Sequence, residues 1–111
     1  MTDDSPVEEL AGEVFEVQDL IEYQSGAIVS RTLIDKGTGT VTVFAFDEDE
    51  RLSEHTAHHD ALLQVLDGSV SVSVADEEYD LDAGESLVLP ADVPHGVEAR
   101  TRFKMLLTMV R

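Results

Sequence analysis

The stretch from Ala61 to Val74 reads Ala-Leu-Leu-Gln-Val-Leu-Asp-Gly-Ser-Val-Ser-Val-Ser-Val and gives the clearest secondary-structure signal in the chain. Its second half alternates serine with valine, as expected of a half-buried strand whose successive side chains point to opposite faces. Its centre, Asp67-Gly68, readily adopts the positive φ angles of a two-residue turn. The stretch therefore predicts two strands joined as a hairpin at Asp67-Gly68.

Short β-rich segments continue on both sides of this stretch. The runs richest in β-branched and aromatic residues cover 27–34, 37–46, 79–81, 86–89, 96–99 and 103–110. A weaker alternation over 14–19 predicts a further strand near the N-terminus. Pro90 and Pro94 place residues 89–94 in a loop, because proline cannot donate to a central ladder. Nine or ten short strands and no helical period predict an all-β antiparallel sandwich or barrel.

The composition predicts one small folded domain. The 111 residues include 24 acids and seven Lys or Arg, for a formal net charge of −17, yet 42% are hydrophobic, as in ordinary globular domains. We expect an acidic, flexible leader over 1–12 and a single domain over 13–111. The acidic excess argues against nucleic acid and against an anionic membrane surface as partners. No apolar run approaches the ~20 residues that cross a bilayer.

The charge also predicts an environment. The chain has no cysteine, and residues 1–30 contain no Lys or Arg, unlike the basic start of a secretory signal. We therefore expect a cytoplasmic protein. Repulsion among so many acids destabilises a compact state at low ionic strength and is screened at high salt. The composition thus favours adaptation to a salt-rich, halophilic cytoplasm over the alternative of an acidic protein from a mesophile.

Histidines are the main candidates for chemistry. The chain has four, of which three lie in His55-Thr-Ala-His-His59 and the fourth is His95. If the two segments occupy neighbouring strands of a barrel, their imidazoles can converge on one ion. Neutral imidazole suits divalent transition metals such as Mn, Fe, Ni and Zn.

These two segments resemble the two motifs of the cupin superfamily. The stretch Gly84-x5-Pro90-x-Asp92-x2-His95 matches the second motif, G-x5-P-x-G-x2-H-x3-N, with Asp92 where glycine is usual and Ala99 at the asparagine position. In the first motif, G-x5-H-x-H-x3–4-E-x6-G, His55 and Gly68 keep their places. The remaining positions of that motif differ: Asp49 stands for the opening glycine, Ala57 for the second histidine, and Ala61 (Leu62 in the longer spacing) for the acid.

The resemblance, to small single-domain cupins, implies a double-stranded β-helix, a jelly-roll-like barrel of two antiparallel sheets that is often paired into a homodimer. In the family, three histidines and one carboxylate typically hold a divalent metal inside the barrel. Only His55 and His95 remain of that set here. If His55 points inward, His59 shares its parity and is the preferred third ligand. Other candidate substitutes are His58, Glu54, Asp60 and Gln64, while a solvated surface position remains an equal alternative for His58 and His59.

The last predicted strand, residues 103–110, supplies further candidate residues for a ligand pocket. Phe103, Met105 and Met109 lie on one face and, with Gln64, form the predicted ligand pocket, although such residues are more often plain core. The reverse face is also apolar, at Leu106 and Val110, as in a strand that packs against a second subunit.

Two functions from different classes follow. One is a metal-dependent cupin enzyme, similar to a dioxygenase or isomerase, acting on a small organic molecule through an ion held by His55 and His95. The other is a metal-free cupin that binds a small molecule without catalysis, which Ala57 and Ala61 favour. Acid–base catalysis by one histidine lies between them. The fold alone does not identify the ligand.

Overall fold

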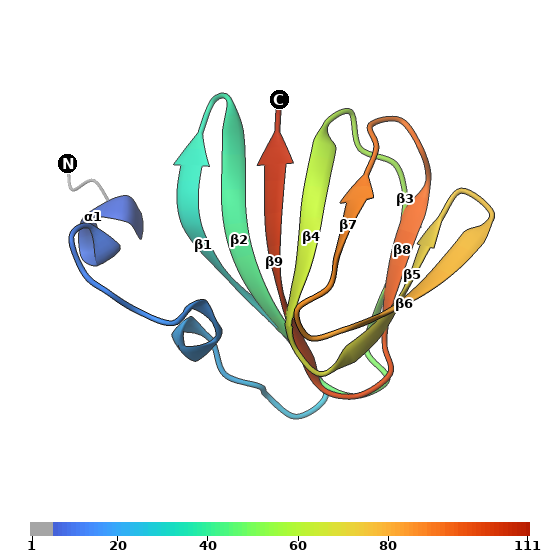
Figure 1. Cartoon of the computed structure of the whole chain (residues 1–111), viewed down its shortest axis with the longest axis horizontal. Helices are drawn as coiled ribbons and strands as arrows, with labels where there is room; N and C mark the ends of the chain where they lie inside the picture. The colour runs from blue at the N-terminus through green and yellow to red at the C-terminus, as the bar shows by residue number, and fades with distance from the viewer. Residues whose placement is uncertain (1–5) are drawn as a thin grey trace.

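The computed structural model describes residues 6–111 (Figure 1). These residues contain nine strands and two short helices. The helices are α1 (Pro6–Leu10) and the 3-10 helix η1 (Val17–Leu20). The strands are β1 (Ile28–Lys36), β2 (Gly39–Phe46), β3 (Arg51–His55), β4 (Asp60–Asp67), β5 (Ser69–Val74), β6 (Glu77–Asp82), β7 (Ser86–Leu89), β8 (His95–Ala99) and β9 (Phe103–Val110).

The strands form two antiparallel sheets, which confirms the predicted all-β double-stranded β-helix. One sheet has the order β1-β2-β9-β4-β7 and the other the order β3-β8-β5-β6. In Figure 1 the strands converge at the bottom of the view and fan apart at the top. β7 ends at Leu89 and β8 begins at His95, so the two prolines lie in the connecting loop, as predicted.

The Asp67-Gly68 turn does not make a hairpin, and that prediction was wrong. β4 and β5 flank the turn as expected, but they belong to different sheets and do not pair. Gly68 has φ of 77°, whereas Asp67 does not adopt a positive φ, so the two-residue hairpin geometry is absent. The turn instead carries the chain from one sheet to the other. A Cβ at Gly68 would lie 2.0 Å from the carbonyl oxygen of Arg102, so only glycine fits.

The N-terminal segment also differs from the sequence-based expectation. The strand predicted over 14–19 is absent, and Val17–Leu20 forms the 3-10 helix η1. The alternation there was too weak to specify a strand, and the side chains of Val17 and Leu20 instead pack against the larger sheet. Of the predicted leader over 1–12, residues 1–5 lie outside the described part; residues 6–10 form α1, and Leu10 packs against the same sheet.

Two apolar clusters stabilise the fold. The main cluster fills the space between the sheets and includes Phe46 and Phe103, whose ring centroids are 4.6 Å apart. The second lies on the outer face of the five-stranded sheet, where Ile21 and Val43 are buried and Leu106 is partly buried. The reverse face of β9 is therefore covered around Leu106 by the N-terminal segment of the same chain. Burial of such side chains supplies the main driving force for folding.

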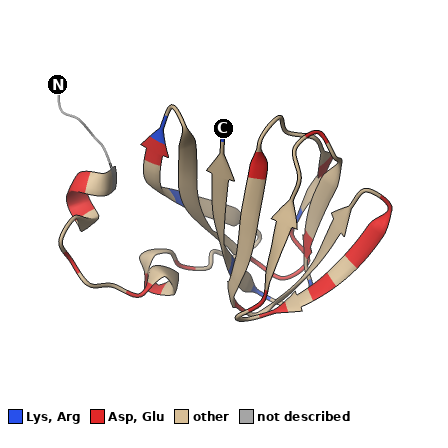
Figure 2. Ribbon diagram, turned by 45° about the horizontal axis from the view of Figure 1, so that its top comes forward, with Lys and Arg blue, Asp and Glu red and all other residues tan. Residues whose placement is uncertain are grey.

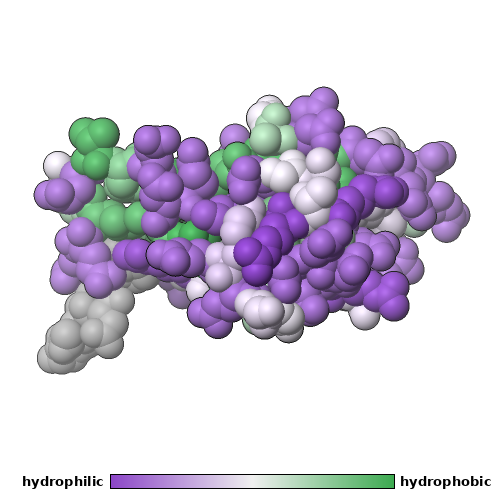
Figure 3. Space-filling view, turned by 90° about the horizontal axis from the view of Figure 1, so that it is seen from below, coloured by the Kyte–Doolittle hydropathy of each residue, from purple (hydrophilic) through white to green (hydrophobic). Residues whose placement is uncertain are grey.

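Acidic residues are distributed along the chain and are most concentrated on β6 (Figure 2). β6, at an edge of the four-stranded sheet, has acids at four of its six positions. Seen from below, the surface is largely hydrophilic, and the hydrophobic atoms gather mainly on the side where the N-terminal segment lies (Figure 3). Among residues 6–111, no helix has the length and apolarity required to span a membrane.

Candidate functional site

His55 and His95 lie side by side across two strands. His55 is the last residue of β3 and His95 the first of β8, and they are register partners. The centroids of the two rings are 4.5 Å apart, with an interplanar angle of 65°. His95 is 9% exposed, whereas His55 is exposed. The structure therefore brings together the two histidines that the motifs single out.

Backbone carbonyls hold both imidazoles in the same tautomer. The Nδ1 of His55 lies 2.9 Å from the carbonyl oxygen of Ser53, and the Nδ1 of His95 lies 3.2 Å from that of Val93. A carbonyl oxygen only accepts hydrogen bonds, so each Nδ1 carries the proton and donates it. The Nε2 of each neutral ring then presents a lone pair. This is the arrangement found for histidines that ligate metals, whose other nitrogen donates to a carbonyl or carboxylate.

Burial keeps His95 in its neutral form. Desolvation is the main cause that lowers the pKa of His95 below its usual 6.5, and the positive charge of a protonated His55 lowers it further. The hydrogen bond to Val93 opposes both effects. The Nε2 of His95 is therefore available as a ligand or hydrogen-bond acceptor at neutral pH.

The other histidines do not join this pair. The Nδ1 of His58 lies 2.8 Å from a carboxylate oxygen of Asp92 at the surface, where the His58 side chain is 87% exposed. β3 ends at His55, so residues 56–59 are no longer strand and the parity that favoured His59 does not apply. Within residues 6–111, no three His, Cys, Asp or Glu side chains are grouped closely enough to hold a metal. His59, Glu54 and Asp60 thus do not complete a ligand set.

Two motif positions that lack glycine still adopt the left-handed backbone conformation that favours glycine. Asp49 and Asp92 stand where the motifs have glycine, and their φ angles are 70° and 63°. Aspartate tolerates this left-handed region better than most residues because its short side chain bonds locally. The amide of Asp92 donates to the carbonyl of Ala57 at 2.7 Å, which ties the loop before β8 to the loop after β3. This contact helps to position both histidine-bearing strand ends.

The residues predicted to line a ligand pocket are divided between the inner and outer faces of the five-stranded sheet. Phe103 and Met105 are fully buried in the main core, so they fill the barrel interior. Met109 is half-buried and pairs with Ala61 where β4 begins. Gln64 alternates with the inward residues Leu63 and Val65 and pairs with Leu106 and Ser86, on the outer face of the five-stranded sheet. A role for Gln64 inside the barrel has no support from this position.

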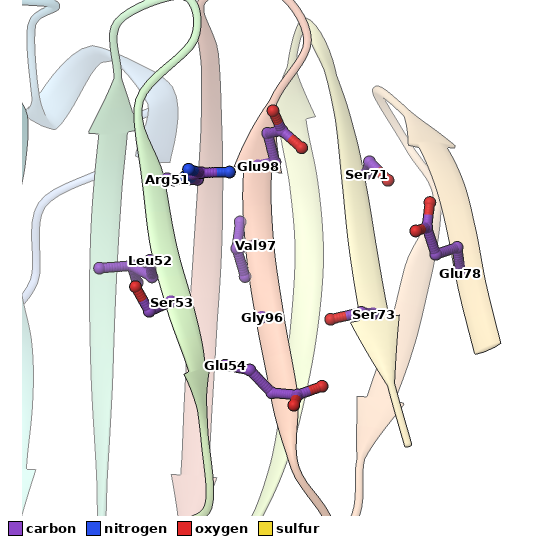
Figure 4. A pocket seen from close by; sticks show the side chains of 10 residues that line it. All are labelled: Arg51, Leu52, Ser53, Glu54, Ser71, Ser73, Glu78, Gly96, Val97 and Glu98. Atoms are coloured by element: carbon purple, nitrogen blue, oxygen red, sulfur yellow. The ribbon is translucent and has the colours of Figure 1, made fainter. Parts of the chain in front are cut away.

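One group of polar residues was not found by sequence reasoning. Two hollows in the described surface are lined by neither His55 nor His95, and one of them is on the outer face of the four-stranded sheet, around Ser71 and Ser73 (Figure 4). The regular alternation of serine and valine over 69–74 was the available signal. It indicated an outward row of hydroxyls but not the strands beside it.

Comparison with known proteins agrees with this architecture. The family model described as a cupin domain matches residues 42–111, more than half of the chain and including both histidines. The chain belongs to the cupin family. No curated protein matches this cupin.

Solved structures resemble this cupin along most of its length. A conserved protein of unknown function from Streptococcus pyogenes is 28% identical, with a TM-score of 0.86 over 90% of this chain and 88% of that one. A cupin superfamily protein from Desulfitobacterium hafniense is 26% identical, with a TM-score of 0.85 over 89% and 91% of the two chains. A cupin 2 conserved barrel domain protein from Leptotrichia buccalis is 44% identical, with a TM-score of 0.84 over 87% of this cupin but only 47% of its own chain.

Proposed function

We propose that this cupin binds a small organic molecule together with a divalent transition metal, both held at the His55–His95 pair. The observation that carries the proposal is the matched pair of tautomers, in which the carbonyl oxygens of Ser53 and Val93 each accept a hydrogen bond from the Nδ1–H of one ring. Among residues 6–111 neither Nε2 atom has a hydrogen-bond partner, and the centroids of the two rings are 4.5 Å apart. Such nitrogens suit Mn, Fe, Ni or Zn.

The residues present fit two ligand positions of such a metal. With no third His, Cys, Asp or Glu grouped with the pair in residues 6–111, the other positions are left to water and to the organic ligand. A bound metal supplies Lewis-acid or redox chemistry to that ligand. The protein's own part is to hold both rings in one tautomer. If the protein is an enzyme, it is a metal-dependent one similar to a dioxygenase or isomerase.

A second candidate function is metal-free binding of a small molecule. It is favoured by alanines at two of the four ligand positions of the family motif, Ala57 and Ala61. In this function the two Nε2 atoms accept hydrogen bonds from donor groups of the ligand, and no catalysis is required. The two candidates differ in one measurable property, the metal content of the protein.

Metal titration separates the two candidates. Untagged protein is purified in high salt, its metal content is measured, and it is titrated with Mn, Fe, Ni and Zn. The parent is expected to bind one metal per chain and the His55→Ala/His95→Ala variant none. The matched control is His58→Ala/His59→Ala, which removes two histidines outside the pair and should bind as the parent does. A parent that binds no metal excludes the first candidate, as does a control that loses binding equally.

We also propose that two copies of this cupin pair through the outer face of the five-stranded sheet. Register places Ile34, Val41, Thr108, Leu62 and Val88 in one cross-strand row that spans all five strands. The row contains no charge, and Ile34, Leu62 and Val88 are exposed. Contact with a second copy would remove these exposed apolar side chains from water.

A further inference from the structure

The outer face of the four-stranded sheet contains a hollow of about 300 Å³ that is separate from the histidine pair (Figure 4). It exists because β5 turns its valines into the main core, which leaves Ser71 and Ser73 on the outside. β8 and β6 flank β5, and β3 lies beyond β8. The hollow is therefore formed by all four strands of a sheet rather than by a mobile loop.

A glycine opens the floor of this hollow. Gly96 on β8 is the register partner of Ser73 on β5. A Cβ at Gly96 would lie 3.1 Å from the Ser73 hydroxyl oxygen and 3.4 Å from the backbone of Glu54. Any side chain at this position would crowd both neighbours and occupy the space.

Ser71 is a largely buried residue whose side chain reaches the hollow. The residue is only 8% exposed, and its side chain lines the hollow. Within residues 6–111 the Ser71 hydroxyl makes no side-chain hydrogen bond, and its oxygen remains open to solvent on the side of the hollow. A nearly buried hydroxyl that faces an open hollow is satisfied by whatever occupies that hollow.

Three carboxylates surround these hydroxyls. Figure 4 shows Glu98 and Glu78 on either side of Ser71, and Glu54 extending over β8 beside Gly96. Arg51 lies at the β3 side, opposite Glu98 in the register, and forms no ion pair within the described part of the chain. Three acids and one base leave the hollow with an excess of two negative charges, which disfavours an anionic ligand.

The spacing of the carboxylates also argues against a single metal ion. No three acidic or metal-ligating side chains in residues 6–111 are close enough to share one ion, although three glutamates line one hollow. A larger cation with ammonium groups at separate points can reach carboxylates that one ion cannot. Its N–H donors would also satisfy the Ser71 and Ser73 oxygens, and charge-assisted bonds of this type are the strong ones.

From this arrangement we infer that the hollow around Ser71, Ser73 and Gly96 is a second binding site, which takes a compact aliphatic dication with an ammonium group at each end. Glu54 and Glu98 bind ammonium groups, the serine hydroxyls accept from the same groups, and the unsubstituted Gly96 leaves room for the connecting chain. The site does not depend on the function proposed for the histidine pair.

The test is an NMR titration of the full chain with 1,4-diaminobutane at moderate salt. Saturable shifts are expected at the amides of β3, β5 and β8. The monocation 1-aminobutane should bind at least about tenfold more weakly, since it loses one charge-assisted contact, and neutral 1,4-butanediol should not bind detectably. Equal binding of the diol would overturn the inference by identifying a polyol site, and shifts spread over the whole acidic surface would overturn it as non-specific attraction.

Matched variants distinguish binding in the hollow from attraction to the overall negative charge of the protein. Glu54→Gln/Glu98→Gln removes two charges inside the hollow, and Glu8→Gln/Glu13→Gln removes two from the N-terminal segment. The first is expected to weaken diamine binding at least about tenfold and the second less than about twofold, because only the first removes direct contacts. Gly96→Ser should block the site without changing the charge, with folding checked from the amide spectrum. Equal weakening by the two glutamate pairs would contradict the inference.

Discussion

At the scale of single residues, the titration of His95 reports directly on the histidine pair. Desolvation and the charge of a protonated His55 both lower its pKa below 6.5. In metal-free protein, the His95 ring resonances are expected to titrate below pH 6.5 in an NMR series. Replacing His55 by Gln removes the neighbouring charge and should move the His95 midpoint upward, toward but not reaching 6.5. A midpoint that stays in place, or that starts above 6.5, would contradict this account.

The same shift has a consequence for stability, and its sign follows from proton linkage. The folded state has the lower pKa, so below pH 6.5 the unfolded chain binds more protons at this position than the folded chain does. The contribution of neutral His95 to the free energy of unfolding is therefore complete above pH 6.5, and it is lost as the pH falls toward the folded-state pKa. Urea unfolding from pH 7.5 to 5.5 should show a decline that is smaller in His95→Gln, which lacks the titrating group.

Asp49 and Asp92 show how much of this region could be read from the sequence. The motif spacing identified both as positions where glycine is usual, but only the structure shows that both have a positive φ even though the residue is aspartate. The spacing also singled out His55 and His95, which the structure places side by side. It could not place His59, because side-chain parity holds only within a strand and β3 ends at His55. The ligand set of a barrel is therefore predictable only as far as the strands extend.

At the scale of elements, the N-terminal segment is fastened to the larger sheet by Tyr23. Its hydroxyl donates to Asp67 at 2.5 Å, and the side-chain cations of Lys104 and Arg102 lie 5.0 and 5.3 Å from the centroid of its ring. Burial and the hydrogen bond to Asp67 raise the pKa of Tyr23, so the hydroxyl keeps its proton. Lys104 also donates to the carbonyl of Gln18 at 2.7 Å. This cluster fixes the segment that covers Leu106.

Removing the Tyr23 hydroxyl should therefore weaken this attachment. Tyr23→Phe keeps the ring and its contacts with the two cations but loses the hydrogen bond to Asp67. We expect a loss of about 1 kcal/mol in the free energy of unfolding, measured by urea denaturation at constant salt. The matched control is Tyr79→Phe, at an exposed tyrosine for which no side-chain hydrogen bond occurs in the described chain, and it should change little. Equal losses in the two variants would show that the Asp67 contact does not stabilise the fold.

Strand positions were largely predictable, but strand partners were not. Alternation of side chains is a local property, so β5 and β9 could be located from their own residues. Pairing depends on residues far apart in the chain. β4 pairs with β9 on one side and with β7 on the other, so β5 cannot pair with it and Asp67-Gly68 instead joins the two sheets. The hollow around Ser71 was hidden for the same reason, since its floor forms only when Gly96 comes to lie opposite Ser73.

At the scale of the whole molecule, the net charge of −17 predicts that stability depends on salt. The screening length falls from about 10 Å at 0.1 M to about 3 Å at 1 M, which removes most of the repulsion among exposed acids. The urea midpoint is therefore expected to rise between 0.1 and 2 M KCl. A Glu8→Gln/Glu13→Gln/Glu22→Gln variant, with three fewer charges, should show a shallower rise. A midpoint that does not change with KCl would contradict adaptation to a salt-rich environment.

The charge also limits how two copies can meet. Four acids on β6 disfavour pairing at that edge of the four-stranded sheet, because like charges would oppose one another. The uncharged row on the outer face of the five-stranded sheet has no such barrier, and high salt screens the acids around it. In 1–2 M salt, light scattering should therefore give about twice the 12.1 kDa mass of one chain.

Two charge-adding variants locate the contact. Leu62→Glu/Val88→Glu places two carboxylates within the row, where pairing would bury them without partners, so this variant should be monomeric. Val14→Glu/Phe15→Glu adds the same charge at two exposed apolar residues outside the row, and it should remain dimeric. A parent with the mass of one chain would refute the dimer, whereas a dimer that survives the first pair of substitutions would place the contact on another surface.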